Sequence, residues 1–156
     1  MNDLFDNGLD SNAARSLAAV TIASRLASAE PITRRDLNEA MVSAFGSSDA
    51  TGSWTQRDSF EVLERALAIH LATRPYPLNR LPDVRSAIAL SESLPTQTVR
   101  SEEQIDAQQF STPIDLAAIA CLLAAPAPTD VVLEPSAGNG LLVAQLAPTA
   151  ALQHCS

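Results

Sequence analysis

The chain has 156 residues, of which 46% are hydrophobic and 18% charged, a balance that favours one folded, soluble domain with a sizeable core. Its 10 basic residues are all arginine and are outnumbered by 18 acidic ones, so the net charge of −8 excludes a strong clamp on the DNA phosphate backbone. No apolar run approaches the ~20 residues that span a bilayer, and the acidic start MNDLFDNGLD does not resemble a signal peptide. We therefore expect a cytoplasmic protein without membrane contact.

The first part of the chain predicts a disordered tail over residues 1–10 and a helical bundle over residues 11–95. Apolar residues recur at helical spacing, and capping residues, glycine and proline bound the segments. In the first segment Leu17, Val20 and Ala27 share one face, and Ile22 and Leu26 share a second. The predicted helices cover residues 11–30, 33–46, 55–73 and 83–93.

Local signals mark the second and third helices of this bundle. Thr33 is a good N-cap with Asp36 three residues later, and Gly46 is placed to end the same helix. The helix after Thr55 has a two-sided apolar surface and is expected to be central. Trp54 is expected to pack on the bundle, and His70 to be a boundary residue with one satisfied ring nitrogen and no catalytic role.

Residues 96–107 predict a polar linker, with a helical turn expected near residues 102–107. The character of the chain changes after this linker. Thr112 as N-cap and Pro113 at the first helical position favour a second start, followed by a helix that is apolar almost all round. A short strand of the buried, parallel-sheet type follows at 130–133, and a helix at 141–146. Residues 108–150 thus predict an α–β–α unit.

The strand leads into the glycine turn of VVLEPSAGNGLL (131–142). Glycines at 138 and 140 allow a sharp turn and close approach of a ligand, and the following helix start offers free N–H groups. A dinucleotide fingerprint would need a third glycine where Val143 stands, which argues against NAD or FAD. A tight turn without any ligand is the simplest alternative for this loop alone.

A second motif, QQFSTPIDLA (108–117), precedes the glycine turn. An F-S-T-P turn, a capped helix, a strand and L-E-P-S-A-G-N-G together resemble the opening of the adenine amino-group DNA methyltransferases. AFGSSDATGSW (44–54), LPTQTVRSEEQ (94–104) and these two motifs occur in an order that resembles the large bacterial methylase/helicase proteins of the strawberry-notch type. The likeness covers about residues 11–152.

This resemblance implies a mainly α chain: an N-terminal helical bundle, then at 108–156 the incomplete first α–β–α unit of a Rossmann-like methyltransferase domain. It also implies part of an S-adenosylmethionine pocket, with the F-S-T-P segment at the methionine end of the cofactor and the glycine turn around it. DNA would be the partner of a full-length parent. The implied cofactor-binding residues are Phe110, Ser111, Thr112, Pro113, Glu134, Pro135, Ser136, Ala137, Gly138, Asn139 and Gly140.

The chain departs from the family pattern in three places. Asn139 replaces the commoner threonine, ALQHCS (151–156) stands where a second strand would bring the acidic residue that holds the ribose, and no [DN]-P-P-[FYW] motif is present. That motif binds the target amino group and stacks on the flipped base. We therefore expect no catalytic residue in this chain and no turnover by it alone.

Two other interpretations stay open. In the first, the 11–95 bundle is a non-catalytic protein-interaction module and the C-terminal part is vestigial. In the second, the chain is a complete small enzyme. The single strand expected here argues against the second, because one strand cannot form the parallel sheet that a cleft requires. Uncovered apolar faces and sheet edges predict folding back onto the bundle, pairing between chains, or partial disorder. His154 and Cys155 are adjacent, but two neighbouring ligands on a polar end do not predict a metal site.

Overall fold

The computed structural model describes residues 10–74, 80–96 and 111–146, and the backbone of residues 151–155. The chain is mainly helical, as predicted. Residues 1–9 of the tail expected over residues 1–10, the helical turn near 102–107 and Phe110 lie outside the described residues. Asp10, which was expected in the tail, is described as the N-cap of the first helix. The elements are α1 (Ser11–Ala27), α2 (Arg34–Phe45), a short 3-10 helix η1 (Asp49–Thr51), α3 (Gln56–Ala72), α4 (Leu81–Ser93), α6 (Ile114–Ala124), β1 (Val131–Glu134), α7 (Leu141–Leu146) and β2 (Ala151–Cys155).

Reciprocal capping bonds start α2 and α3. The Thr33 side chain accepts a hydrogen bond from the Asp36 backbone N–H, and the Asp36 carboxylate accepts one from the Thr33 backbone N–H. Thr55 and Asp58 repeat the arrangement at α3. Each pair satisfies donors that a helix start would otherwise leave without a partner. The predicted ends of α2 are confirmed, including Gly46, which adopts the left-handed conformation with φ of 69°.

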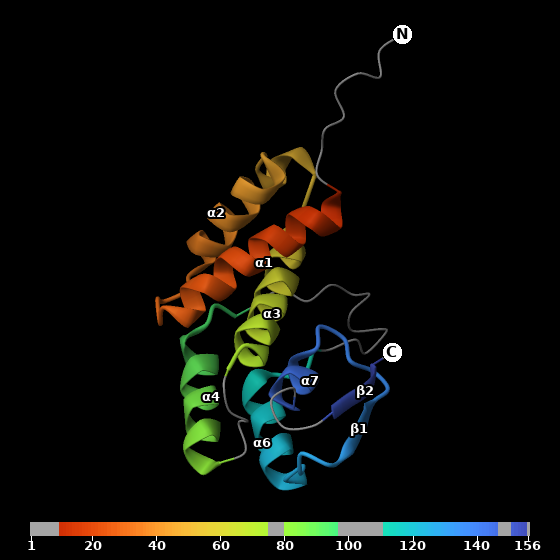
Figure 1. The fold of residues 1–156 in the computed structure, drawn as a ribbon. Coiled ribbons are helices and arrows are strands. Elements are labelled where there is room, and N and C mark those ends of the chain that lie inside the picture. The colour runs from red at the N-terminus through yellow and green to blue at the C-terminus, as the bar shows by residue number, and fades with distance from the viewer. Residues whose placement is uncertain (1–9, 75–79, 97–110, 147–150, 156) are drawn as a thin grey trace, which may run out of the picture.

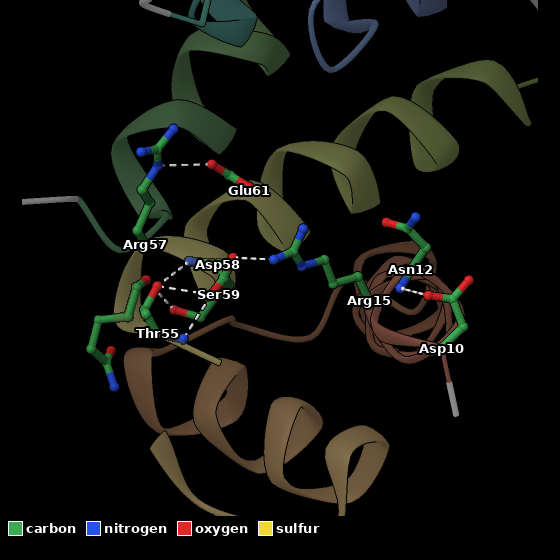
Figure 2. Close-up of polar contacts among 9 residues, drawn as sticks. Asp10, Asn12, Arg15, Thr55, Arg57, Asp58, Ser59 and Glu61 are labelled. Carbon is green, nitrogen blue, oxygen red and sulfur yellow. Dashed lines mark hydrogen bonds and ion pairs between the residues drawn. The ribbon is translucent and has the colours of Figure 1, made fainter. Parts of the chain in front are cut away.

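Two arginines of α1 bind the same capping carboxylates. Arg15 Nη2 lies 2.6 Å from Asp58 Oδ1, as Figure 2 shows, and Arg25 Nη1 lies 2.7 Å from Asp36 Oδ1. Each carboxylate therefore caps its own helix and also holds α1 against it. Because two donors from separate elements meet one acceptor group, helix initiation and helix packing support each other here.

The helices pack as a continuous series in which α3 is the shared element. Helix α1 packs on α2 and α3, and α3 also packs on α7; α6 lies against both α4 and α7. Figure 1 shows α3 running from the α1–α2 pair towards the C-terminal elements. One hydrophobic cluster extends from Ile22 on α1 to Ala144 on α7. The C-terminal elements thus fold back onto the helices, which is one of the three outcomes expected for them.

The core side of α1 differs from one part of the prediction. Ile22 and Leu26 are buried as one face, but Leu17 and Val20 are about half exposed. The core is formed instead through alanines 14, 18, 19 and 23, which let α1 approach its neighbours closely. Trp54 is buried as predicted, and its indole N–H donates to the Ser47 carbonyl at 2.8 Å.

Two helix starts differ from the predicted positions. Helix α4 begins at Leu81, two residues before the expected Asp83, whose carboxylate accepts from the Arg80 backbone N–H at 3.1 Å. Helix α6 begins at Ile114, and the N-cap is Pro113, so the prediction of Thr112 as the cap is wrong. Pro113 has a ψ of 148°, which is an extended and not a helical value, so the helix begins only at Ile114.

A two-stranded parallel sheet forms the C-terminal end of the fold. Strand β1 pairs with β2, with Val131 opposite Ala151 and Glu134 opposite Cys155. The expectation of a single strand is therefore wrong, and with it the ground on which a complete small enzyme was set aside. The predicted burial of β1 is also wrong, because Val131 and Leu133 are 69% and 68% exposed. One face of β1 is left open in the described structure.

Helix α6 is only partly covered, although it is apolar almost all round. It packs between α4 and α7 through Ala117, Ala118 and Cys121. Leu116 and Leu123 remain exposed, however. The expectation of uncovered apolar surface in this part of the chain is therefore confirmed for α6 and β1.

Candidate functional site

The glycine loop, residues 135–140, connects the carboxyl end of β1 to α7. Glu134 ends the strand, as predicted, and its Oε1 accepts a hydrogen bond from the Ser136 backbone N–H at 2.9 Å. The Gly140 N–H donates to the Ala137 carbonyl at 2.8 Å, which closes the turn before the helix. The carboxyl ends of parallel strands are where open α/β sheets place ligands.

Glycine is favoured at positions 138 and 140 by the backbone conformation, and not by a lack of space for a side chain. Gly138 and Gly140 have φ of 52° and 79°, a left-handed region that other residues rarely adopt. A Cβ atom built at either position would meet no heavy atom within 4 Å. The space beside both residues is therefore open for a ligand to approach the backbone.

The two sequence motifs are linked through the helices that follow them. The side chain of Gln145 on α7 is buried, and its Nε2 donates to the Ile114 carbonyl at 3.4 Å. This bond joins α7, which follows the glycine loop, to the first residue of α6, which follows Ser111–Pro113. The described part of the F-S-T-P segment is exposed.

The predicted site residues lie largely on the surface. Glu134, Ala137 and Gly140 are half-buried. The exposed ones are Ser111, Thr112, Pro113, Pro135, Ser136, Gly138 and Asn139. The structure thus has an accessible loop at a strand end, where a ligand would meet backbone groups, the Glu134 carboxylate and the exposed polar side chains of Ser136 and Asn139.

One residue at this loop was missed by sequence reasoning. Glu64 of α3 accepts a hydrogen bond from the Asn139 side-chain amide through its Oε2. The two residues are 75 positions apart, and Glu64 lies in the middle of an amphipathic helix where spacing alone indicates a solvated charge. Only the packing of α3 on α7 brings them together.

The other titratable groups do not form a second chemical centre among the described residues. No group of three histidine, cysteine, aspartate or glutamate side chains in that part of the chain could hold a metal ion. Burial raises the pKa of the Cys121 thiol to about 11, which keeps it protonated and unreactive. The side chains of His154 and Cys155 lie outside the described residues.

His70 occupies the boundary position expected for it. Its Nε2 lies 3.2 Å from Arg74 Nη2, one helical turn further on. Burial first, and then the charge of Arg74, lower the pKa of the imidazole from its usual range. A neutral ring that accepts a hydrogen bond from Arg74 accounts for this contact.

A shallow groove runs along α2 and is lined by Arg34, Arg35, Asn38, Glu39, Val42 and Ser43. Its arginines are already engaged: Arg35 Nε lies 2.8 Å from Glu39 Oε1, and Arg34 Nη2 donates to the Thr96 carbonyl at 2.6 Å. The groove is therefore a less suitable anion site than its composition suggests.

Among the helices that are described, none has the length and apolar character to cross a bilayer.

Comparisons with known protein families, with curated proteins and with solved structures find no match to this chain.

Proposed function

We propose that this chain is the N-terminal segment of an S-adenosylmethionine-dependent DNA methyltransferase of the methylase/helicase type, with part of the cofactor pocket. The observation that carries the proposal is the glycine loop at the carboxyl end of β1. There, two left-handed glycines leave the backbone accessible beside a pair of parallel strands. The order α6, β1, loop, α7 and β2 supports a Rossmann-like beginning.

The residues at the loop suit the chemistry of this cofactor. S-adenosylmethionine has a positively charged sulfonium and hydroxyl donors on its ribose, for which a carboxylate and carbonyl oxygens are suitable partners. Glu134 stands at the strand end, and no Cβ atom obstructs approach at Gly138 or Gly140. In this proposal the loop holds the cofactor, and Ser111–Pro113 borders its methionine end.

The cofactor, when bound, supplies an activated methyl group, and the chain's own residues bind and orient it. Methyl transfer also needs a site for the target amine, whose acceptors take up developing positive charge on nitrogen. The sequence contains no [DN]-P-P-[FYW] turn to provide such acceptors. The proposed activity of this chain is therefore cofactor binding, without a catalytic residue of its own.

Calorimetric titration of S-adenosylmethionine tests the proposal directly. Gly140→Val introduces a branched side chain at a φ of 79° beside the proposed site, and Gly52→Val does the same at a φ of 78° in the loop after η1. Both variants carry a similar backbone strain. We expect the wild type and Gly52→Val to bind the cofactor and Gly140→Val to lose binding at least tenfold, a difference of about 1.4 kcal/mol. Absence of binding to the wild type, or equal binding by both variants, contradicts the proposal.

The exposed apolar pair on α1 favours a second candidate function, a non-catalytic helical interaction module. Leu17 and Val20 lie one turn apart on the solvent side of α1. A Leu17→Ser/Val20→Ser double variant keeps the core intact and removes this surface. Cross-linking in cells followed by mass spectrometry should recover a specific partner with the wild type and lose it with the double variant. Recovery of the same partners by both proteins would contradict the module.

A further inference from the structure

Helix α3 joins the helical region to the glycine loop through a side-chain contact. Glu64 is half-buried on α3, and its carboxylate accepts a hydrogen bond from the Asn139 amide in the loop. Helix α3 is itself held by its capping bonds and by Arg15. The carboxylate of Glu64 is therefore presented to the loop from a fixed support.

The glycine content of the loop makes a contact from outside it valuable. Its local bonds include those from the Ser136 N–H to Glu134 and from the Gly140 N–H to Ala137, and the Gly140 carbonyl accepts from the Ala144 N–H at the start of α7. Glycine loses more conformational freedom on ordering than any other residue, and two of the six loop residues are glycine. A hydrogen bond to a charged acceptor on a rigid helix restricts the segment between these two glycines.

We propose that Glu64 is a positioning residue for the glycine loop, which acts through Asn139 and couples the packing of α3 to ligand binding. The loop then binds its ligand with less ordering on association, which strengthens binding. The identity of the ligand as S-adenosylmethionine rests on the proposed function, whereas the ordering of the loop by Glu64 does not. The helical region has, on this view, a direct role at the site.

A neighbouring glutamate on the same helix provides the matched control. Glu61 lies one turn before Glu64 and pairs with Arg57 within α3 at 2.9 Å (Figure 2). Glu61→Ala and Glu64→Ala each remove one negative charge from α3 and make the same change in helix propensity. The contact with the loop is lost only in Glu64→Ala.

Amide hydrogen exchange of the cofactor-free protein measures the positioning role. We expect the backbone amides of residues 136–141 to exchange about 5- to 10-fold faster in Glu64→Ala and in Asn139→Ala. Amides in the middle of α3 and α7 should keep the wild-type rate, and Glu61→Ala should leave the loop unchanged. Unchanged loop exchange in both variants, or equal acceleration throughout α3 and α7, overturns the proposal.

An exchange of donor and acceptor separates this bond from a general effect of either side chain. Asn139→Asp alone places two carboxylates together and should accelerate loop exchange. The double variant Glu64→Gln/Asn139→Asp reverses the bond, since the glutamine amide can donate to the aspartate, and should restore exchange to within about twofold of the wild-type rate. Failure of the double variant to restore exchange overturns the assignment.

Cofactor titration then completes the test. S-adenosylmethionine affinity should fall about 3- to 10-fold in Glu64→Ala, remain unchanged in Glu61→Ala and recover in the reversed pair. Altered loop exchange without cofactor binding by any protein supports the positioning role and overturns the proposed function. Wild-type cofactor affinity in Glu64→Ala overturns the coupling to ligand binding.

Discussion

The helices α1–α3 and the elements that follow them differ in how they are stabilised. In the first region, two capping carboxylates are shared with arginines of α1, and large apolar side chains such as Ile22, Leu37 and Met41 are fully buried. The second region, α4 to β2, has a small sheet with one open apolar face and an apolar helix with exposed leucines. It is held to the first region through the packing of α7 on α3.

The comparison shows that hydrophobic composition alone does not produce a closed core. Helix α6 has a higher proportion of apolar residues than α1 or α3, yet Leu116 and Leu123 are exposed. The buried helices combine apolar faces with polar groups that define their ends and their partners. We therefore expect the first region to be rigid and the second to open more readily, with α3 as the element common to both.

The largest expected difference concerns two leucines. Leu37→Ala removes a side chain that is 1% exposed, whereas Leu133→Ala changes one that is 68% exposed. Urea denaturation should show a loss of about 2–5 kcal/mol for Leu37→Ala and under about 0.5 kcal/mol for Leu133→Ala. A comparable loss in both variants would mean that the open face of β1 is covered in solution.

Cys121 reports on the opening of the second region. Its pKa of about 11, raised from 9.0 by burial, leaves about 100-fold less thiolate at pH 8 than in an ordinary thiol. In a Cys155→Ser background, a disulfide exchange reagent should react slowly with Cys121 in the folded protein. The reaction should accelerate at urea concentrations below the main circular dichroism transition, since α6 is expected to open first. Acceleration only within that transition would show that both regions unfold together.

The capping groups provide a smaller, paired test. Thr55 accepts from the Asp58 backbone N–H at the start of α3, whereas Thr112 makes no capping bond at α6. Thr55→Ala should reduce the free energy of unfolding by about 1 kcal/mol, and Thr112→Ala should change it by under about 0.5 kcal/mol. Thermal or urea unfolding of both variants checks this. A larger loss at Thr112 would argue that α6 is capped as the sequence pattern predicts.

His70, in the last turn of α3, should produce the smallest effect. Burial and the nearby Arg74 lower its pKa below 6.5, so the unfolded chain binds a proton more readily than the folded one. The stabilising effect of a neutral His70 is therefore present above about pH 6.5 and is lost as the pH falls from that value through the lower pKa of the folded protein. An NMR titration should give a midpoint below 6.5, which Arg74→Gln should raise. A midpoint at or above 6.5 would show that the imidazole of His70 is solvated in the folded protein.

Local patterns predicted where the helices lie, although the starts of α4 and α6 and one face of α1 differ from the prediction. The pair Thr33 and Asp36 predicted the start of α2, and Gly46 its end, because capping depends on residues within one turn. The strand end at Glu134 followed in the same way from the apolar run before it. Strand β2 was not predicted, because it forms by pairing with β1, and this pairing joins Val131 to Ala151 across 20 positions of the sequence.

In the candidate site, too, the local features could be predicted from the sequence and the long-range contacts could not. The glycine turn could be read from VVLEPSAGNGLL because positive φ favours glycine wherever it occurs. The contact between Glu64 and Asn139 could not, since it arises from the docking of α3 on α7. The sequence by itself determined where the helices lie, the capping pair and glycine end of α2, and the glycine turn, which depend on interactions within a few residues. Only the tertiary structure decided which apolar faces are covered and which helix contacts the loop, because these depend on contacts between distant segments.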